Sequence, residues 1–316
     1  MNKDIVRVEE LKKNELDRVI ALFCLVWGDK YSIVEAKTKW AFENPFSKVL
    51  VMKNESGSVI AVRGGIEWPL QYEGENIKAI QFHGTCVHPD YRRKGFFSLI
   101  NKSFVSLAKE NGFELIFNVS VKASRLGYEK LGWKYTKGFQ RLTKVHLFNS
   151  IKKKKEHVFE DEQCENIIEI PESVLKERNR YFKNLVSTNY TKDFFKWRLS
   201  NGKENYFLFS HKEAYIIYKI KKIANKKHLI IGDVFLMSHN YKDFKRAFNL
   251  LFKKVVPDLS YTYIHKGHPY YKFYLQSLFI PNFMNLNLNF GVKELKKENT
   301  YTNLSWGCSF LDIDTF

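Results

Sequence analysis

Cysteines, long apolar runs and acidic residues are scarce in this 316-residue sequence. Its cysteines, Cys24, Cys86, Cys164 and Cys308, are widely separated and form no Cys-x-x-Cys pair. This spacing argues against a zinc ribbon or a disulfide framework, indicates no metal site, and suits a reducing cytoplasm. The longest apolar run covers only residues 19–27, whereas a membrane-spanning helix needs about 18 apolar residues. The N-terminal residues lack an apolar signal segment, so we predict a cytoplasmic protein without a membrane span.

Acidic residues are outnumbered: 52 Lys and Arg face 34 Asp and Glu, which gives a net charge of +18. This balance favours anionic partners, namely nucleic acid, anionic lipid or phosphorylated small molecules. For most individual lysines, a purely solubilising role is an equal alternative. The sequence has no helix-turn-helix, RNA-recognition or zinc-finger motif. A basic nucleic-acid-binding module is therefore the weaker interpretation.

The chain length predicts two domains, at about 150 residues per domain. The hydrophobic content of 44% is ordinary for a globular protein. Four consecutive lysines at 152–155 are followed by the acidic residues Glu156, Glu160, Asp161 and Glu162. A basic block followed by an acidic block is typical of a solvated linker. We therefore predict domains at 1–150 and 166–316, joined by a charged linker at 151–165.

The two halves show the same order of predicted elements. Trp40-Ala-Phe-Glu-Asn44 and Trp197-Arg-Leu-Ser-Asn201 each follow a predicted helix and precede strand-like runs. In both halves the order is helix, three strands, helix, strand, helix or turn, strand. A repeated order of this kind indicates two related folds in tandem. The predicted class is α/β (α+β), with mixed central sheets flanked by helices.

The most informative segment follows a predicted strand that ends near Val87. Pro89 ends the strand, and a basic loop with Gly95 then leads directly into a helix. Unpaired amides and partial positive charge at a helix N-terminus favour a phosphate there. The side chains of the loop add formal positive charge, and Gly95 lets the backbone approach an anion closely. The glycine spacing fits neither a Walker loop nor a dinucleotide fingerprint.

This loop resembles the acetyl-CoA signature of the GNAT family of N-acetyltransferases, whose pattern is Arg/Gln-x-x-Gly-x-Gly/Ala. Arg92 and Gly95 match the pattern, whereas Phe97 occupies its final small position. The resemblance implies that the loop amides bind the diphosphate of coenzyme A and that amides near 85–87 pair with its pantetheine arm. The cofactor-binding residues implied in this way are Cys86, Val87, Arg92, Arg93, Lys94, Gly95, Phe96, Phe97, Ser98 and Asn118.

A second motif, Tyr128-Glu-Lys-Leu-Gly-Trp133, resembles the family's Tyr-Glu-Lys-Leu-Gly-Phe. In many members that tyrosine protonates the departing thiolate of coenzyme A. A phenol keeps its proton at neutral pH, so Tyr128 is the candidate general acid. Its other interpretation is a core aromatic residue on a helix.

His83 lies on the strand that leads into the loop and is the candidate general base, because imidazole titrates near neutral pH. A buried structural histidine is the alternative. Trp40, Glu67, His265 and His268 are the candidate residues for binding the acceptor. The second half has no glycine in its matching loop, and Asp243 there would repel a phosphate. It is therefore predicted to be a degenerate copy that shapes the acceptor cleft.

At the level of the whole chain, the sequence resembles bacterial nucleotide-sugar N-acyltransferases. Trp306, Asp312 and Asp314 form a Trp…Asp-x-Asp ending that contributes to this likeness. The resemblance implies acyl transfer from acetyl-CoA or 3-hydroxybutanoyl-CoA to a dTDP-3-amino-3,6-dideoxyhexose, for surface-polysaccharide synthesis. Another amine acceptor remains open: an aminoglycoside, a polyamine or a peptide N-terminus. A tandem aminoacyl-tRNA-dependent peptidoglycan transferase is disfavoured, because no long charged helical arm interrupts the second half.

Overall fold

The computed structural model describes residues 6–136, 138–147, 169–200, 204–282, 288–296 and 301–313. The predicted linker at 151–165, together with Cys164 and Asp314, lies outside the described residues. None of the helices in the described ranges is long and apolar enough to span a membrane.

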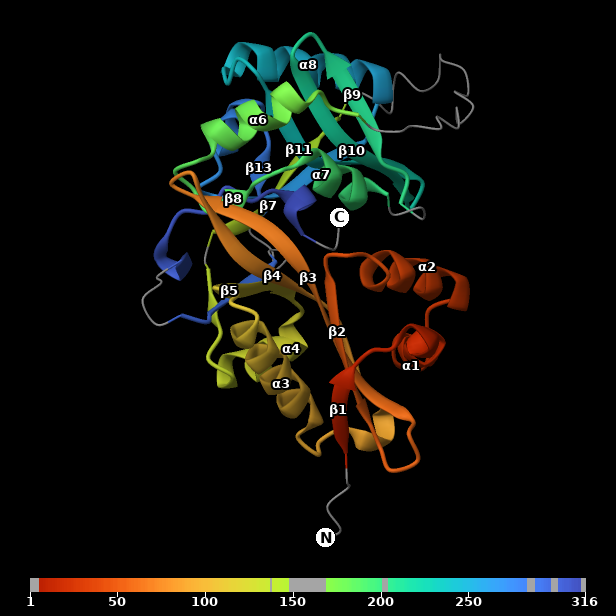
Figure 1. Ribbon diagram of the computed structural model, residues 1–316. Coiled ribbons are helices and arrows are strands. Elements are labelled where there is room, and N and C mark those ends of the chain that lie inside the picture. The colour runs from red at the N-terminus through yellow and green to blue at the C-terminus, as the bar shows by residue number, and fades with distance from the viewer. Residues whose placement is uncertain are drawn as a thin grey trace.

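The first sheet contains most strands of the N-terminal half (Figure 1). Its order is β1-β2-β3-β4-β5-β14-β6, and β8 pairs with β3. The strands are β1 (Arg7–Glu10), β2 (Ser47–Lys53), β3 (Val59–Tyr72), β4 (Glu75–Val87), β5 (Leu115–Ser120), β6 (Lys134–Tyr135), β8 (Ser187–Thr188) and β14 (Asn289–Glu294). On one face pack η1 (Lys13–Glu15), α1 (Leu16–Trp27) and α2 (Tyr31–Phe42); on the other pack α3 (Phe96–Glu110) and α4 (Lys122–Lys130).

The second sheet has the order β13-β7-β12-β11-β10-β9. Its strands are β7 (Phe139–Val145), β9 (Phe207–His211), β10 (Ala214–Ile223), β11 (Lys226–Leu236), β12 (Leu259–His265) and β13 (Ile280–Pro281). One face is covered by α8 (Tyr241–Val255) and α9 (Tyr271–Gln276). The other face meets α6 (Glu172–Tyr181), α7 (Lys192–Leu199) and the C-terminal 3-10 turn η4 (Phe310–Asp312), whereas η3 (Tyr301–Asn303) lies against β14 of the first sheet.

The two halves exchange a strand. β7 comes from the N-terminal half but pairs with β12 of the second sheet over seven residue pairs. In return, β14 comes from the C-terminal half and pairs with β5 of the first sheet over six residue pairs. Because each sheet needs a strand from the other half, the predicted segments 1–150 and 166–316 are structurally interdependent.

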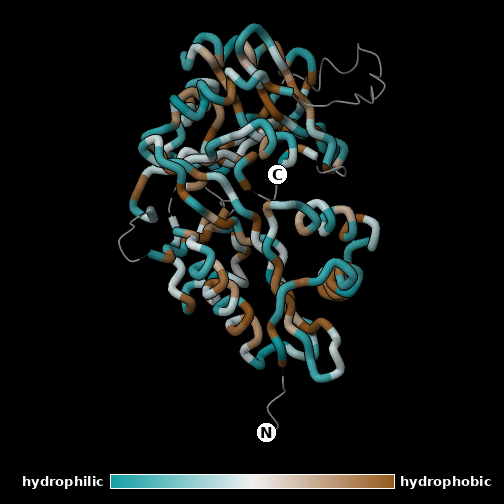
Figure 2. Tube along the Cα trace, in the orientation of Figure 1, coloured by the Kyte–Doolittle hydropathy of each residue, from teal (hydrophilic) through white to brown (hydrophobic). Residues whose placement is uncertain are grey.

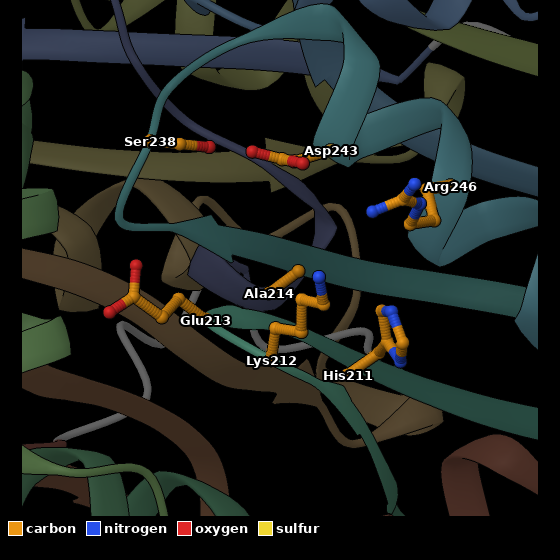
Figure 3. Close-up of a pocket in the computed structure, with 7 residues that line it drawn as sticks. All are labelled: His211, Lys212, Glu213, Ala214, Ser238, Asp243 and Arg246. Carbon is orange, nitrogen blue, oxygen red and sulfur yellow. The ribbon is translucent and has the colours of Figure 1, made fainter.

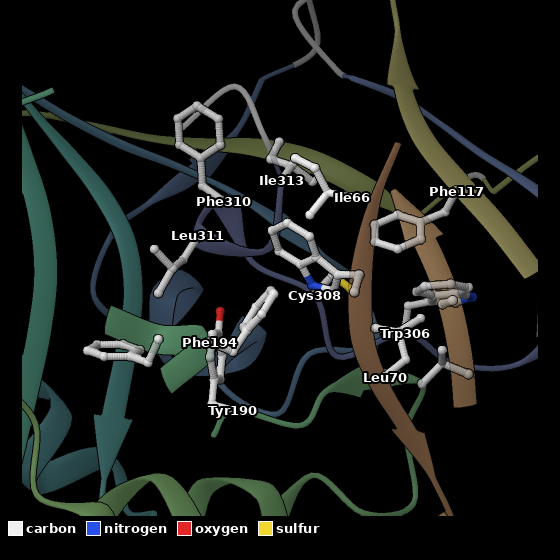
Figure 4. Close-up of a cluster of buried hydrophobic side chains, with 14 of the residues drawn as sticks. Ile66, Leu70, Phe117, Tyr190, Phe194, Trp306, Cys308, Phe310, Leu311 and Ile313 are labelled. Carbon is white, nitrogen blue, oxygen red and sulfur yellow. The ribbon is translucent and has the colours of Figure 1, made fainter. Parts of the chain in front are cut away.

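An apolar cluster between the two sheets draws on both halves (Figure 4). Ile66 and Leu70 of β3 and Phe117 of β5 meet Phe194 of α7 and Trp306 near the C-terminus. Figure 2 shows brown, hydrophobic stretches along the strands and teal stretches at turns and on the outer helices. Burial of such side chains from water is the main force that holds the sheets together.

The local predictions around the loop are confirmed. The strand expected to end near Val87 is β4, and the helix expected directly after the loop with Gly95 is α3. A hairpin turn with Gly74 at φ +84° joins β3 to β4. The repeated order of elements is also present, since α2-β2-β3-β4-α3-β5-α4 corresponds to α7-β9-β10-β11-α8-β12-α9. The prediction of a mixed α/β fold with two sheets is therefore confirmed.

Candidate active site

The loop between β4 and α3 forms an open cradle for an anion. After β4 ends at Val87, a 3-10 turn, η2 (Pro89–Tyr91), leads to Gly95, the N-cap of α3. Gly95 has φ +83°, and Arg93 has φ +62°. No side chain caps the first amides of α3, and a Cβ added at Gly95 would meet nothing within 4 Å. Left-handed residues beside a free helix N-terminus turn backbone amides toward an anion.

A cavity of about 400 Å³ opens beside this cradle. Most of the predicted cofactor-binding residues line it: Cys86, Val87, Arg92, Arg93, Gly95, Phe96 and Phe97. Val26, Thr85 and Tyr91 complete its lining. Lys94, Ser98 and Asn118 do not line it. Lys94 is exposed with its ammonium 5.0 Å from the ring centroid of Tyr91, and Ser98 is a half-buried residue in the first turn of α3.

Strands β4 and β5 separate just before the cavity. They pair in parallel only from Ala79 to Gln81, while β4 continues to pair with β3 as far as Val87. A bulge at Gly84 interrupts the β3–β4 register, and such bulges bend a strand and re-aim its side chains. One edge of β4 is thereby left without a β5 partner, as a pantetheine arm would require.

Asn118 is the β5 residue that follows the last paired position, Phe117. Its side chain is buried, and its Oδ1 atom has no hydrogen-bond partner among the described residues. A buried carbonyl oxygen without a donor is costly. An amide N–H of the pantetheine arm would supply that donor, so the residues present fit this part of coenzyme A.

Phe97 replaces the small residue of the family pattern, and Gly127 makes room for it. A Cβ added at Gly127 would lie 2.9 Å from Cε1 of Phe97. The ring of Phe97 also lies 5.4 Å from that of Tyr128, centroid to centroid. Glycine inside a helix costs about 1 kcal/mol relative to alanine, so its use in α4 is explained by the bulk of Phe97. Phe97 therefore both lines the cavity and contacts the ring of Tyr128, the candidate general acid.

Tyr128 is buried on α4, and its hydroxyl oxygen accepts a hydrogen bond from Nη2 of Arg63. Arg63 is itself buried on β3, with its guanidinium 4.1 Å from the ring centroid of Phe82. The sequence analysis missed Arg63, because a single arginine within an apolar strand gives no local signal of its partner.

The candidate base His83 lies beside α2. Its ring is 6.1 Å from that of Trp40 and 6.0 Å from that of Phe42, both edge to face. Along β4 the neighbouring residue Phe82 faces the α3 side, where it belongs to the same cluster as Tyr128. Since side chains alternate along a strand, His83 and Tyr128 approach the separated edge of β4 from opposite faces of the sheet.

Trp40 stacks on Trp197, its counterpart in the second half, with centroids 5.1 Å apart and ring planes 1° from parallel. The Trp40 indole N–H also donates to the backbone oxygen of Trp197 at 3.2 Å. The repeated Trp-x-x-x-Asn segments therefore meet where the halves join. Trp40 is the one predicted acceptor residue that the structure brings to His83.

The other predicted acceptor residues lie elsewhere. Glu67 is half-exposed and pairs with Lys48 at 3.7 Å. His265 ends β12 and His268 lies in the turn that follows; both are buried, and their Nδ1 atoms accept from the amides of Gly267 and Tyr270. None of the three lines the loop cavity. Their acceptor roles stay predictions.

Cys86 lines the cavity, but burial raises the pKa of its thiol to about 12. The reactive form of cysteine is the thiolate, so this residue is protonated and unreactive at neutral pH. Among the described residues, no group of three or more histidine, cysteine or carboxylate side chains could hold a metal ion.

The matching loop of the second half is capped by its own side chains. Asn240 caps α8 by accepting from the amide of Asp243, and hydrogen bonds from Ser238 and Asn240 lower the pKa of Asp243. Figure 3 shows the small pocket beside this helix start, of about 150 Å³, with Asp243 and Ser238 on one side. Arg246 and the β9–β10 turn, from His211 to Ala214, complete it. An anion would meet a carboxylate and a helix start that is already capped.

The gap between β11 and β12 is filled by the C-terminal segment. On β11, only His228 to Ile230 pair with β12. In the first half, β4 and β5 likewise pair over a short stretch, from Ala79 to Gln81 of β4. The amide of His265 on β12 then donates to the backbone oxygen of Cys308, and Ser309 forms a β-bridge with Ile264. The space that pantetheine would need is taken by the chain itself. The second half therefore has the form of a degenerate copy.

Comparisons with known proteins agree with this fold. Residues 7–136 match the family model of the acetyltransferase (GNAT) domain. A GCN5-related N-acetyltransferase from Anabaena variabilis superposes with a TM-score of 0.69 at 12% identity, covering 92% of this chain and 73% of that one. A GCN5-related N-acetyltransferase from Kribbella flavida superposes with a TM-score of 0.62 at 12% identity, covering 92% of this chain and 71% of that one. Comparison with curated proteins gives no match.

N-myristoyltransferase from Saccharomyces cerevisiae, solved with bound myristoyl-CoA, also shares the fold across both halves. Its TM-score is 0.55 at 13% identity, and the superposition covers 98% of this chain and 87% of that one. The chain thus has a GNAT-like fold, and its residues 7–136 match the GNAT acetyltransferase domain model. The domain match and the fold support an N-acyltransferase enzyme.

Proposed function

We propose that this protein transfers an acyl group from acyl-CoA to the amino group of a nucleotide-linked amino sugar. The preferred acceptor is a dTDP-3-amino-3,6-dideoxyhexose, with an acetyl or 3-hydroxybutanoyl donor, in surface-polysaccharide synthesis. The proposal assigns the reaction to the cytoplasm, in line with the scattered cysteines of the sequence. The observation that carries the acyl-CoA part is the open N-terminus of α3 beside the separated edge of β4.

On the donor side, the amides at Phe96, Phe97 and Ser98 would hold the diphosphate, with Arg92 and Arg93 adding charge. Both arginines are exposed to solvent at the cavity, where their side chains can contact an anion that enters from solvent. The oxygen of Asn118 would accept from the pantetheine arm. A coenzyme A thioester, when bound, supplies an activated acyl group.

On the acceptor side, the proposal rests on the face of β4 that carries His83. Trp40 and Trp197 lie there as stacked, half-buried indoles. Flat aromatic surfaces of this kind suit sugar faces and nucleobases, because these also present flat faces for stacking. The net charge of +18 favours an acceptor that carries a nucleotide diphosphate.

The reaction we propose is direct transfer within a ternary complex. His83, or a water beside it, accepts a proton from the acceptor amine as nitrogen attacks the thioester carbonyl. Amides along the edge of β4 that lacks a β5 partner would stabilise the negative charge that develops on the carbonyl oxygen. Tyr128 gives its proton to the departing thiolate. The protonated state of Cys86 argues against a covalent acyl-cysteine intermediate.

A thiol-release assay tests the substrate assignment. Acetyl-CoA and 3-hydroxybutanoyl-CoA are each offered with a panel of dTDP- and UDP-amino sugars. We expect coenzyme A release that depends on one nucleotide sugar, with the N-acylated sugar as the product found by mass spectrometry.

Spermidine, an aminoglycoside and a peptide amine serve as controls for other acceptors. Turnover on one of these, without turnover on any sugar nucleotide, would overturn the proposed acceptor but leave the acyltransferase chemistry intact. A His83→Asn variant, with a Glu67→Gln control, separates a base on β4 from a distant carboxylate.

A further inference from the structure

The contact between Arg63 and Tyr128 constrains where the tyrosine proton points. A guanidinium has only donors, so in this hydrogen bond the phenol oxygen accepts. The hydroxyl hydrogen of Tyr128 is therefore directed away from Arg63 and toward another acceptor. Both side chains are nearly inaccessible, with exposed fractions of 1% for Arg63 and 2% for Tyr128. Hydrogen bonds to charged donors are stronger in such surroundings than in water.

Arg63 is aimed by the same bulge that separates the strands. It pairs with Thr85 on β4, directly beside the skipped residue Gly84. The packing of its guanidinium over Phe82 fixes the side chain on the α3 side of the sheet. The residue that contacts the tyrosine is thus built into the strand geometry that opens the cofactor slot.

The second half supplies an internal comparison. Tyr274 lies two residues before the end of α9, as Tyr128 does in α4. In both cases the amide five residues further along donates to the tyrosine carbonyl, at 3.0 Å from Phe279 and 3.1 Å from Trp133. Leu278 even repeats the left-handed backbone of Gly132, with φ +65° against +77°.

The arginine is missing from this second copy. A bulge in β10–β11 puts Ile217 beside the register shift, at the position that Arg63 occupies in the first half. The hydroxyl of Tyr274 instead shares a hydrogen bond with Thr262. A tyrosine at this turn is thus present in both halves, whereas the Arg–Tyr pair occurs only beside the open loop.

We infer that Arg63 is a positioning residue that holds the hydroxyl of Tyr128 for proton donation to the departing thiolate and stabilises the phenolate that results. This inference rests on the proposed acyl-CoA transfer. In the step, the Tyr128 O–H bond breaks and an S–H bond forms on coenzyme A. The phenolate then forms an ion pair with Arg63 and regains a proton from solvent before the next turnover.

A double-mutant cycle tests the inference with the full-length protein. The variants are Tyr128→Phe, Arg63→Met and the double variant, with Tyr274→Phe as the matched control. We expect Tyr128→Phe to lower kcat about 100-fold, within the range for general acids. Arg63→Met should lower kcat about 10-fold or more alone and by less than about two-fold in the Phe background, because coupled residues are not additive. In the control Tyr274→Phe, both the kcat and the Kd for coenzyme A should change by less than about two-fold.

A second measurement does not depend on turnover. The affinity for coenzyme A is compared with that for desulfo-coenzyme A, which lacks the sulfur. If Tyr128 meets the sulfur, wild type should prefer coenzyme A by about three- to ten-fold, as expected for one hydrogen bond. Tyr128→Phe and Arg63→Met should each remove this preference. If Arg63→Met does not fold, Arg63→Lys, which keeps a charged donor, takes its place with an intermediate loss expected.

The outcomes are separable. If Arg63→Met lowers kcat by the same factor in the wild-type and Tyr128→Phe backgrounds, the inference is overturned while the proposed function stays intact. A sulfur preference in wild type that survives Arg63 replacement would do the same. If Tyr128→Phe and Arg63→Met both lose the preference for coenzyme A over desulfo-coenzyme A, and wild type acylates no amine, the inference is supported and the proposed substrate is refuted.

Discussion

Gly95 offers the sharpest test of the coenzyme A cradle. Its φ of +83° is a conformation in which an L-residue costs about 1–2 kcal/mol. Alanine also restricts the unfolded chain, which offsets about 0.4–1 kcal/mol of that cost. A Cβ there would meet no protein atom within 4 Å and would project into the approach to the helix start. Gly95→Ala should therefore destabilise the fold by about 1 kcal/mol, or about 2 °C in Tm for a chain of this size.

Its effect on binding should be much larger. Loss of one hydrogen bond to a charged diphosphate costs about 1.5–3 kcal/mol, which corresponds to a rise of about 10- to 150-fold in Kd. Isothermal titration with coenzyme A measures this Kd, and thermal unfolding without ligand measures the stability cost separately.

Gly112 at the other end of α3 is the matched control. It has φ +74°, and its added Cβ would also meet nothing within 4 Å. Gly112→Ala should cost similar stability and leave the Kd for coenzyme A unchanged. If Gly95→Ala binds coenzyme A as tightly as wild type, the assignment of the diphosphate to this helix start is wrong. Equal weakening in both variants would instead point to a general effect of destabilisation.

Three further predictions concern buried groups. Cys86→Ala should keep the transfer rate within about three-fold of wild type, since the native thiol is protonated; a 100-fold loss in a steady-state assay would indicate a covalent role. Burial and the charge of His268 lower the pKa of His265 to about 4. The free energy of unfolding should therefore be highest above about pH 6.5 and fall as the pH drops toward 4. If the dependence of Tm on pH is the same in His265→Gln as in wild type, this prediction is refuted. Arg178→Met strands the buried carboxylates of Asp233 and Asp312 and should cost about 3–5 kcal/mol in denaturant unfolding; a loss below about 1 kcal/mol would contradict it.

Local sequence patterns predicted the loop and its flanking elements well. The apolar spacing of 96–110, the glycine at each end and the strand before it are governed by interactions between near neighbours. By contrast, the full length of β3 was not predicted, because Gly64, Gly65 and Pro69 weaken a strand pattern. The structure explains the glycines: added Cβ atoms would lie 2.4 Å from Phe42 and 2.6 Å from Ile80. Those neighbours come from other elements, so no local pattern could predict them.

The sequence by itself determined the element order, the repeat and the basic loop, since each depends on residue types at short spacing, whereas the candidate acid was implied by the resemblance of its motif to the GNAT family. Only the tertiary structure decided the exchange of β7 and β14, the filling of the second gap by residues 308–309, and the pairing of Arg63 with Tyr128, 65 positions apart. Contacts between distant segments form because apolar faces and buried polar groups must find partners in three dimensions. Such partners are set by the packing of the whole chain, which no window of sequence contains.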